Sequence, residues 1–378
     1  MKQRLWILVL TALLLAGCVL EHPEDPEMQT TKESSQTQQT LESQEAASVV
    51  TENFTHVEPV GTVPPEFQKI VEEDLFRNVV AFPDRLLSSE SATQTEKTIR
   101  MYDFSGNLLQ EQTVTLPSEN HVLSSLTATS DGGFLYVQGF QDRYLDEDHV
   151  WASERGVAST IVKYSPGGTV EWELYLENYD GHMLDTCIEL EDGYYFFGEQ
   201  ETPETDVIGA ASPTDIHITK VEKSGTVLQT GAIGGSDFDF LNLVYPAGDS
   251  FILYCETQSS DGDFPSGGLW RLEMDSALNL TEQIPFTSDA CRILGYLDGE
   301  PVLNDQKIFD GYDYFHFPTA LLDYGDFYLI VSENKTGLWE DKPPEVSSAL
   351  YYTETVYSAF DKDGSLLWRA SVDSSPDY

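Results

Sequence analysis

The sequence predicts an all-β fold, a β-propeller of about six four-stranded blades, and counts from five to seven fit the same repeats. Two short elements recur about every 50 to 60 residues along most of the chain, and together they account for four strands in each repeat. Helical periodicity is confined to one short segment after the N-terminal region. Four-stranded units that recur with little helix are typical of blades stacked around a channel.

The first recurring element is a hairpin with a turn glycine at its centre. A large apolar residue precedes each glycine by four positions, and apolar residues follow it on the second strand. The copies are Tyr102 with Gly106, Tyr164 with Gly168, Val221 with Gly225, and Phe360 with Gly364. Because glycine accepts the positive φ of a tight turn, each copy is expected to form two antiparallel strands.

The second recurring element is a polar turn followed by a strongly apolar strand. Its copies are residues 131–137, 191–197, 248–254 and 325–331. Their nearly continuous apolar character favours strands that are buried on both faces.

The repeats divide the chain into predicted blades, which span residues 77–117, 121–176, 183–233, 239–286, 290–317 and 319–373. The fifth blade is the weakest, because the next repeat follows so soon that its outer hairpin, around Ile308 to Phe317, must be short. An array of β-sandwiches is the structural alternative, since sandwiches also contain many short strands. The length of the repeat region and the similarity of its units favour closure into a propeller.

A single helix is expected just before the repeats, over residues 65–76. Phe67, Ile70 and Val71 fall on one helical face, and Pro65 suits a first turn. This helix would lead into a propeller domain that spans residues 77–378.

The N-terminus has the pattern of a secretion signal. Lys2 and Arg4 precede an apolar run over residues 5–14, and small residues lead to Cys18. The run is shorter than the roughly 20 apolar residues of a membrane-spanning helix, and its end lacks the Ala-x-Ala pattern of an ordinary signal. It resembles the lipobox of bacterial lipoproteins. This resemblance implies a signal peptide over residues 1–17, a diacylglycerol on Cys18, and a protein held at the extracytoplasmic face of the bacterial cell membrane.

Residues 18–64 are expected to form a disordered tether after the lipidated cysteine. The segment is rich in Glu, Gln, Thr and Ser and has few large apolar residues, so it cannot bury enough surface to fold alone. A flexible chain of about 40 residues has a mean reach of about 35 Å. That distance would hold the folded domain clear of the lipid head groups.

The chain is strongly acidic, with a formal charge of −45. Removal of the signal with Lys2 and Arg4 leaves 18 basic and 65 acidic residues, a charge of −47. Such a surface repels phosphate backbones and anionic lipids, so we expect no nucleic-acid partner and membrane attachment through the lipid alone. We expect a monomer.

Three cysteines remain after Cys18, namely Cys187, Cys255 and Cys291. Three thiols cannot all pair, and a bridge between Cys255 and Cys291 stays open in an oxidising compartment. Their apolar, strand-like surroundings favour free buried thiols. The chain has no Cys-x-x-Cys motif, so nothing in its cysteines points to a structural zinc site.

The candidate site residues lie outside any known catalytic motif. Asp261 and Asp263 place two carboxylates on one side of an extended loop, where hard oxygen ligands could hold Ca²⁺. Trp151 and Trp339 lie in the long insertions 142–159 and 335–353, where binding residues tend to be placed. No catalytic residue is assigned, and no cofactor besides Ca²⁺ is expected.

The repeats also carry a family resemblance. The positions that carry it are Asp131-Gly132-Gly133, Lys163-Tyr164 with Gly168 and Trp172, Gly364 with Trp368, and the Gly-Gly-Ser-Asp run 234–237. Their order is similar to that of the degenerate propeller repeats of secreted bacterial proteins, over about residues 77–373. The resemblance implies a fold and an exported setting, and no activity comes with it.

Two kinds of function remain open at this point. The first is a membrane-anchored, non-enzymatic binding or scaffold module for a protein or a component of the cell envelope. The alternative is an extracellular glycan-binding protein, or a glycan hydrolase or lyase that uses carboxylates as acid and base. Since no catalytic motif is present, we expect the first.

Overall fold

The computed structural model describes residues 56–93, 95–118, 121–140, 143–145, 151–153, 158–176, 183–201, 214–259, 261–263, 266–287, 292–304, 317–338 and 351–374. The chain divides into two compact units. One comprises Met1–His56 and Lys335–Tyr352, and the other comprises Val57–Asn334 and Thr353–Tyr378. The second unit holds the β-sheets except for strand residues 335–338 and 351–352, which fall in the first.

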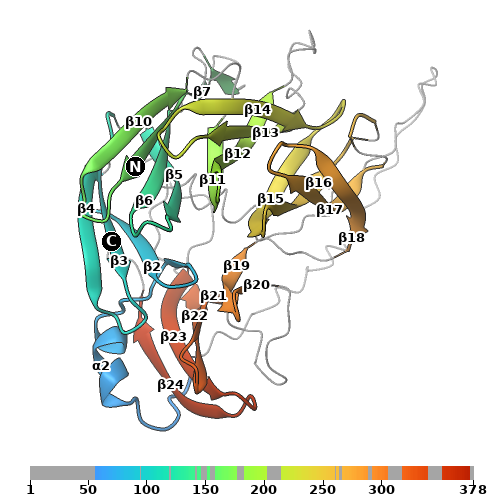
Figure 1. Cartoon of the computed structure of the whole chain (residues 1–378). Coiled ribbons are helices and arrows are strands. Elements are labelled where there is room, and N and C mark those ends of the chain that lie inside the picture. The colour runs from blue at the N-terminus through green and yellow to red at the C-terminus, as the bar shows by residue number, and fades with distance from the viewer. Residues whose placement is uncertain are drawn as a thin grey trace, which may run out of the picture. The chain divides into compact units, whose positions relative to one another are not determined.

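Five four-stranded blades form an all-β propeller (Figure 1). Strands that follow one another in the chain are neighbours in each blade, with the first strand of each blade innermost. Blade 1 consists of β1 (Val79–Ala81), β2 (Leu86–Ser91), β3 (Glu96–Tyr102) and β4 (Leu108–Thr115), and blade 2 of β5 (His121–Ala128), β6 (Phe134–Phe140), β9 (Ala158–Tyr164) and β10 (Val170–Leu176). Blade 3 consists of β11 (Met183–Leu190), β12 (Gly193–Glu201), β13 (Thr214–Val221) and β14 (Val227–Ile233), and blade 4 of β15 (Asp239–Ala247), β16 (Ser250–Thr257), β17 (Gly268–Asp275) and β18 (Leu280–Phe286). Blade 5 consists of β21 (Phe317–Asp323), β22 (Phe327–Leu338), β23 (Tyr351–Asp361) and β24 (Leu366–Asp373).

The fifth of the six predicted blades is not a blade in the described residues. It contains β19 (Ile293–Leu297) and β20 (Glu300–Leu303), an antiparallel pair attached to the sheet of blade 5. The attachment is a single parallel pairing of Gly295 with Leu321. A Cβ on Gly295 would lie 1.9 Å from the Leu321 carbonyl oxygen, so only glycine fits there. Of the outer hairpin predicted around Ile308 to Phe317, residues 308–316 lie outside the described residues and Phe317 begins β21.

The local patterns that predicted the blades match the strands. The hairpin glycines Gly106, Gly168, Gly225 and Gly364 all have positive φ, from 74° to 89°. The second strand of blade 3 is buried on both faces, because the consecutive side chains of Tyr195, Phe196 and Phe197 are all 0% exposed. Apolar side chains from neighbouring blades therefore form the core between sheets, as when the Phe197 ring meets the edge of Phe251, with 5.4 Å between ring centroids.

The one described helix is α2 (Pro65–Glu72), four residues shorter at its C-terminal end than expected. It ends in a Schellman motif, in which the Leu75 N–H donates to the Ile70 carbonyl at 3.0 Å and the Asp74 N–H donates to the Val71 carbonyl at 3.2 Å. Asp74 supplies the left-handed residue of this motif with φ of 47°.

Glycine is the usual residue at this position of the motif, but the Asp74 side chain makes hydrogen bonds that glycine cannot make. The carboxylate accepts hydrogen bonds from the Tyr357 hydroxyl at 2.8 Å and the Thr355 hydroxyl at 3.0 Å, both on β23. Burial raises the pKa of Asp74, although these two hydrogen bonds act in the opposite direction. The end of α2 is thereby fixed to the last blade.

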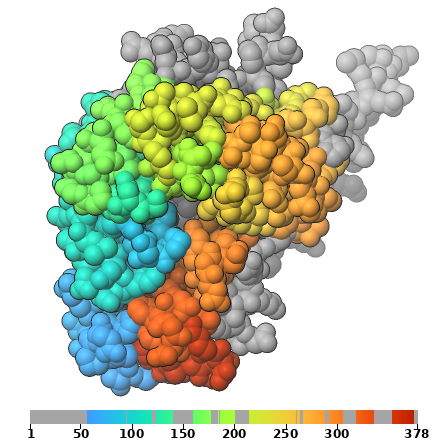
Figure 2. All heavy atoms as spheres, in the orientation of Figure 1, coloured from blue at the N-terminus to red at the C-terminus, as the bar shows by residue number. Residues whose placement is uncertain are grey.

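The segment before blade 1 closes the ring by packing against blade 5 (Figure 2). Val60 pairs with Arg369 on β24 through two backbone hydrogen bonds of 2.8 and 3.0 Å. The Phe67 ring meets the edges of Tyr324 and Phe327, with centroid distances of 5.0 and 5.5 Å. On the other side, Ile70 fills the space where a Cβ on Gly106 of blade 1 would lie.

We predict that Asp74→Ala lowers the free energy of unfolding by about 2–4 kcal/mol, because it loses two hydrogen bonds and places alanine in the left-handed region. Asp74→Gly should cost about 1–2 kcal/mol, because glycine accepts that backbone conformation. Urea unfolding followed by tryptophan fluorescence measures both values.

The matched control is Asn78→Ala. Asn78 also has a left-handed backbone, with φ of 54°, but it is exposed. Asn78→Ala should lower the free energy of unfolding only by the part of the Asp74→Ala effect that comes from placing alanine in the left-handed region. If Asp74→Gly unfolds at the same urea concentration as the unaltered protein, the carboxylate is not what fixes α2 to blade 5.

Candidate functional site

The two ends of the propeller differ in the length of their connections. In an antiparallel blade, the second-to-third strand connection leaves at one end, and the first-to-second and third-to-fourth connections leave at the other. The latter connections contain two to five residues in every blade, and we call this the short-turn end. The second-to-third connections contain ten to seventeen residues in blades 2 to 5, and four in blade 1. We call this the long-loop end.

The long connections are also acidic. They comprise residues 141–157, 202–213, 258–267 and 339–350. Together they carry twelve Asp and Glu residues against three Lys and Arg residues. The long connections therefore carry a net charge of −9, from twelve acidic and three basic residues.

The predicted recognition residues belong to two of these connections. Trp151 begins β8 (Trp151–Ser153), which pairs with β7 (Arg143–Leu145) in a separate hairpin between β6 and β9. Its side chain lies outside the described residues, and so does the whole of Trp339. The predicted signal peptide, the lipidated Cys18 and the tether up to residue 55 also lie outside them, so lipid attachment stays a prediction.

Asp261 and Asp263 lie at the long-loop end and hold the link between blades 3 and 4. Asp261 Oδ1 accepts a hydrogen bond from the Ser236 N–H at 2.8 Å, and Asp263 Oδ2 accepts one from the Gly234 N–H at 3.2 Å. The Asp263 N–H also donates to the Gly234 carbonyl at 3.0 Å. The Gly-Gly-Ser-Asp run 234–237 thus has a structural role that explains its glycines, since a Cβ on Gly235 would lie 2.8 Å from Asp261 Oδ1.

Asp239 lies beneath this link and is 0% exposed. Its carboxylate accepts hydrogen bonds from the Gly235 N–H at 2.8 Å, the Ser259 hydroxyl at 3.0 Å and the Thr257 hydroxyl. Burial raises the pKa of Asp239 despite these three donors. The sequence shows Asp239 only as one of two acids two residues apart, and its burial depends on strands that are distant in sequence.

Asp215, at the start of β13, adds a fourth acid whose carboxylate meets the same link. Its Oδ1 atom is buried without a hydrogen-bond partner among the described residues, and it would lie 1.9 Å from a Cβ on Gly234. Burial first, and then the charges of Asp239 and Asp263, raise the pKa of Asp215. When ionised, Asp215 is therefore a negative charge whose Oδ1 has no hydrogen-bond donor among the described residues, at the long-loop end between blades 3 and 4.

These carboxylates do not form a metal centre by themselves. Within the described ranges, no group of three or more His, Cys, Asp or Glu side chains is placed to hold a metal ion. Asp261 and Asp263 each use one oxygen on a backbone N–H. Calcium binding at Asp261 and Asp263 stays a prediction.

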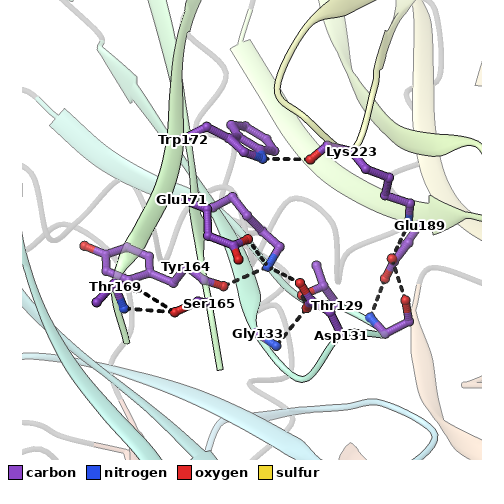
Figure 3. A network of polar contacts seen from close by, with 12 residues as sticks. Thr129, Asp131, Gly133, Tyr164, Ser165, Thr169, Glu171, Trp172, Glu189 and Lys223 are labelled. Atoms are coloured by element: carbon purple, nitrogen blue, oxygen red, sulfur yellow. Dashed lines mark hydrogen bonds and ion pairs between the residues drawn. The ribbon is translucent and has the colours of Figure 1, made fainter. Parts of the chain in front are cut away.

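A second polar network fixes the turns at the short-turn end (Figure 3). The Lys163 side chain is 1% exposed, and its ammonium group lies 2.8 Å from Asp131 Oδ2, 3.1 Å from Glu171 Oε2 and 2.8 Å from the Tyr164 carbonyl oxygen. Asp131 in turn accepts hydrogen bonds from the Thr129 hydroxyl at 2.6 Å and the Gly133 N–H at 2.9 Å. The Lys163 and Asp131-Gly132-Gly133 positions thus belong to one ion pair, in which the lysine is buried and the carboxylate is partly exposed.

The same network ties blade 2 to blade 3 (Figure 3). Glu189 on β11 accepts hydrogen bonds from the Ser130 N–H at 2.6 Å and the Ser130 hydroxyl at 2.7 Å, and it pairs with Lys223. The Trp172 indole N–H donates to the Lys223 carbonyl at 3.0 Å. Related pairs occur in blade 3, between Lys220 and Asp192 at 2.7 Å, and in blade 5, between Lys362 and Asp323.

The described cysteines are structural. Cys187 and Cys255 are free thiols and buried, as expected, and burial raises the pKa of both. A thiol with a raised pKa is a weak nucleophile at neutral pH. Cys291 lies outside the described residues.

Among the described residues, no helix is both long enough and apolar enough to cross a membrane.

Comparisons with known proteins give no family for this chain. No family model matches the sequence, and no curated protein matches it. Among solved structures, a mutant of Synechocystis apocarotenoid oxygenase is 13% identical with a TM-score of 0.38, and the match covers 86% of this chain and 78% of that chain. An α-L-arabinofuranosidase from Lactobacillus brevis is 11% identical with a TM-score of 0.40, covering 76% and 91%. The hemagglutinin-neuraminidase of parainfluenza virus 5 is 9% identical with a TM-score of 0.37, covering 85% of each.

These similarities are too low to carry an argument about activity. The propeller assignment rests on the blades themselves, and the site rests on its own residues.

We predict that Asp215→Asn raises the free energy of unfolding by about 1 kcal/mol at pH 7, because it removes a carboxylate whose Oδ1 is buried without a partner. A raised folded-state pKa means that the folded protein binds this proton more tightly than the unfolded chain does. Stability contributed by this group is therefore lost as pH rises above its ordinary pKa of 3.8. The gain from the substitution should disappear at about pH 3, as measured by urea unfolding across the pH range.

The control is Asp275→Asn. Hydrogen bonds from Asn279 lower the pKa of Asp275, so this substitution should destabilise the protein at neutral pH and have a smaller effect in acid. An Asp215→Asn effect that is the same at both pH values would contradict the assignment of the penalty to charge.

Lys163→Met should lower the free energy of unfolding by about 1–3 kcal/mol, because it leaves Asp131 and Glu171 without their shared cation. The estimate is below that for a fully buried pair, since both carboxylates are partly exposed. Lys69→Met on the exposed face of α2 is the matched control and should be neutral within about 0.5 kcal/mol. Equal effects of the two substitutions would show that the network does not stabilise the turn.

Proposed function

We propose that the chain is a membrane-anchored, extracytoplasmic propeller that binds a protein or an envelope component through its long-loop end, without catalysing a reaction. The observation that carries this proposal is the segregation of the connections. Long acidic segments leave one end, and tight turns close the other. Binding residues in many folds lie on loops that a rigid scaffold positions.

The scaffold beneath the long connections is well fixed. Asp239 and the carboxylates of Asp261 and Asp263 hold the link between blades 3 and 4 through backbone hydrogen bonds. Blade 4 therefore presents its loop from a rigid base. The excess of carboxylates in the long connections favours a partner whose contact surface carries basic residues or bound cations, and it disfavours nucleic acid.

The anchor is the other part of the proposal, and it rests on the sequence. Lipid on Cys18 would keep the protein at the bacterial cell membrane, and the tether would let the propeller reach partners within about 35 Å on average. A monomer suffices for this role, because one copy carries both the anchor and the binding end.

Glycan binding is the alternative, and Trp151 is the residue that supports it. Trp151 begins a short hairpin between β6 and β9, so the backbone places an aromatic residue in a defined strand within the longest connection. Aromatic side chains stack on sugar rings in many binding sites. A carboxylate-dependent hydrolase or lyase would use the same end, with paired acids as its catalytic groups.

The proposal predicts position-dependent crosslinking on intact cells. A photo-reactive amino acid in place of Val150, in the long connection of blade 2, should capture a partner. The same substitution at Asp249, in a short turn of blade 4, should not. Cys18→Ala releases the protein from the membrane and should abolish the capture at position 150, as detected by immunoblotting and mass spectrometry.

Three results would contradict the proposal. Equal capture at both positions would show that recognition is not confined to the long-loop end. Cleavage of envelope polysaccharides by the purified chain, lost when the acids of the long connections are replaced by their amides, would establish the hydrolase or lyase instead. Binding of a labelled glycan that depends on Trp151 would establish the glycan-binding alternative.

A further inference from the structure

A pocket of about 360 Å³ lies at the short-turn end, away from the long connections. It is lined by the turns at the ends of β1, β3, β19 and β21, and so it sits between blade 1, the β19–β20 hairpin and blade 5. The residues that define its chemistry are Phe82, Phe104, Tyr296, Leu321, Asp298 and Asp323. Its volume is at the lower end of the range of small-molecule sites.

The pocket is located where the regular repeat is interrupted. Only two strands, β19 and β20, stand between blades 4 and 5 in the described residues, and they join blade 5 through the single pairing of Gly295 with Leu321. The turn at Asp298 and Gly299 therefore meets the turn of blade 5 and the first turn of blade 1 around a shared space. Leu321, at 1% exposure, contributes to the wall of that space.

The walls are aromatic and apolar. Phe82, Phe104 and Tyr296 contribute three rings, and Leu321 adds an aliphatic surface. Burial raises the pKa of Tyr296, so its phenol is neutral at physiological pH. Such a lining suits a compact apolar body, and aromatic rings can attract a positive charge.

The charged lining residues are both acids. Asp323 Oδ1 is engaged by Lys362 and by the Gly325 N–H at 2.8 Å. Asp298 is exposed, and no described residue hydrogen-bonds to its carboxylate. Its backbone is left-handed, with φ of 53°, which fixes the position of the turn at the edge of the pocket. Besides the Tyr296 hydroxyl, no lining side chain can donate a hydrogen bond to a neutral polar ligand.

We propose that this pocket binds a small organic cation, an amine or quaternary ammonium group on an aromatic or compact aliphatic body. The rings hold the body, the ring faces attract the cation, and the Asp298 carboxylate neutralises its charge. A sugar is the competing occupant, but it requires hydrogen-bond donors beside the acceptors. The pocket lies at the end opposite to the proposed recognition surface, so either assignment can fail without the other.

The test is isothermal titration of the purified full chain with benzylamine, which is cationic at neutral pH, and with benzyl alcohol, its neutral counterpart of nearly equal size. We expect benzylamine to bind at least about tenfold more tightly than benzyl alcohol. Asp298→Asn should remove most of this preference without a change in the affinity for benzyl alcohol. Asparagine tolerates the left-handed backbone as aspartate does, so the turn should keep its conformation.

The matched control is Asp249→Asn. Asp249 is an exposed acid in the corresponding first-to-second turn of blade 4, and it does not line the pocket. It removes the same charge from the same end and should leave benzylamine binding unchanged. A second variant, Phe104→Leu, should weaken both ligands, with folding checked by circular dichroism.

The proposal is overturned by equal affinities for the two ligands, by equal effects of Asp298→Asn and Asp249→Asn, or by the absence of heat with benzylamine at millimolar concentration. Binding of glucose that Phe104→Leu abolishes would assign the pocket to a sugar instead.

Discussion

Closure of the ring is the interaction on which the rest of the propeller depends, and it is made by a segment that belongs to no blade. Val60 pairs with the outermost strand of blade 5, α2 packs its apolar face between blades 5 and 1, and Asp74 anchors the end of the helix on β23. The contacts with blade 5 join residues from opposite ends of the folded domain. The pocket at the short-turn end exists because the same closure brings the first turn of blade 1 beside the turns of β19–β20 and blade 5.

The two ends of the propeller differ in how their connections are built. At the short-turn end, the buried Lys163 stabilises a turn of blade 2 through its ion pair with Asp131. Glu189 of blade 3 binds the neighbouring Ser130 and pairs with Lys223, and so it connects this turn to the next blade. In blade 2 these contacts explain the Asp131-Gly132-Gly133 turn and Lys163, since Asp131 and Lys163 form one ion pair. At the long-loop end, the connections of blades 2 to 5 are longer and vary from ten to seventeen residues.

Features encoded locally could be predicted from the sequence, and features made by distant pairs could not. The turn glycines and the apolar second strands predicted four-stranded units with nearly correct boundaries, because a strand such as β12 is recognisable from its own residues. The count of six was not exact: the described residues of the predicted fifth blade form only β19 and β20, which look like the first strands of any blade, and the five blades lie within the predicted range of five to seven. The helix ended early because Asp74 is fixed by Tyr357, and no local pattern reveals a partner 283 residues away. The buried carboxylate of Asp239 and the pocket beside Asp298 were missed for the same reason.

The pairing of Val60 with Arg369 has a consequence for the order of folding. In a chain that is synthesised from its N-terminus, α2 emerges before any blade, but much of the surface that covers the helix belongs to blade 5, which emerges last. Blades 1 to 4 consist mainly of local hairpins and can form as they appear, whereas ring closure must wait for the final strand. Until then Phe67, on the apolar face of α2, lacks its contacts with Tyr324, Phe327 and Trp368. The ring is therefore closed late, in a single step that requires the complete chain.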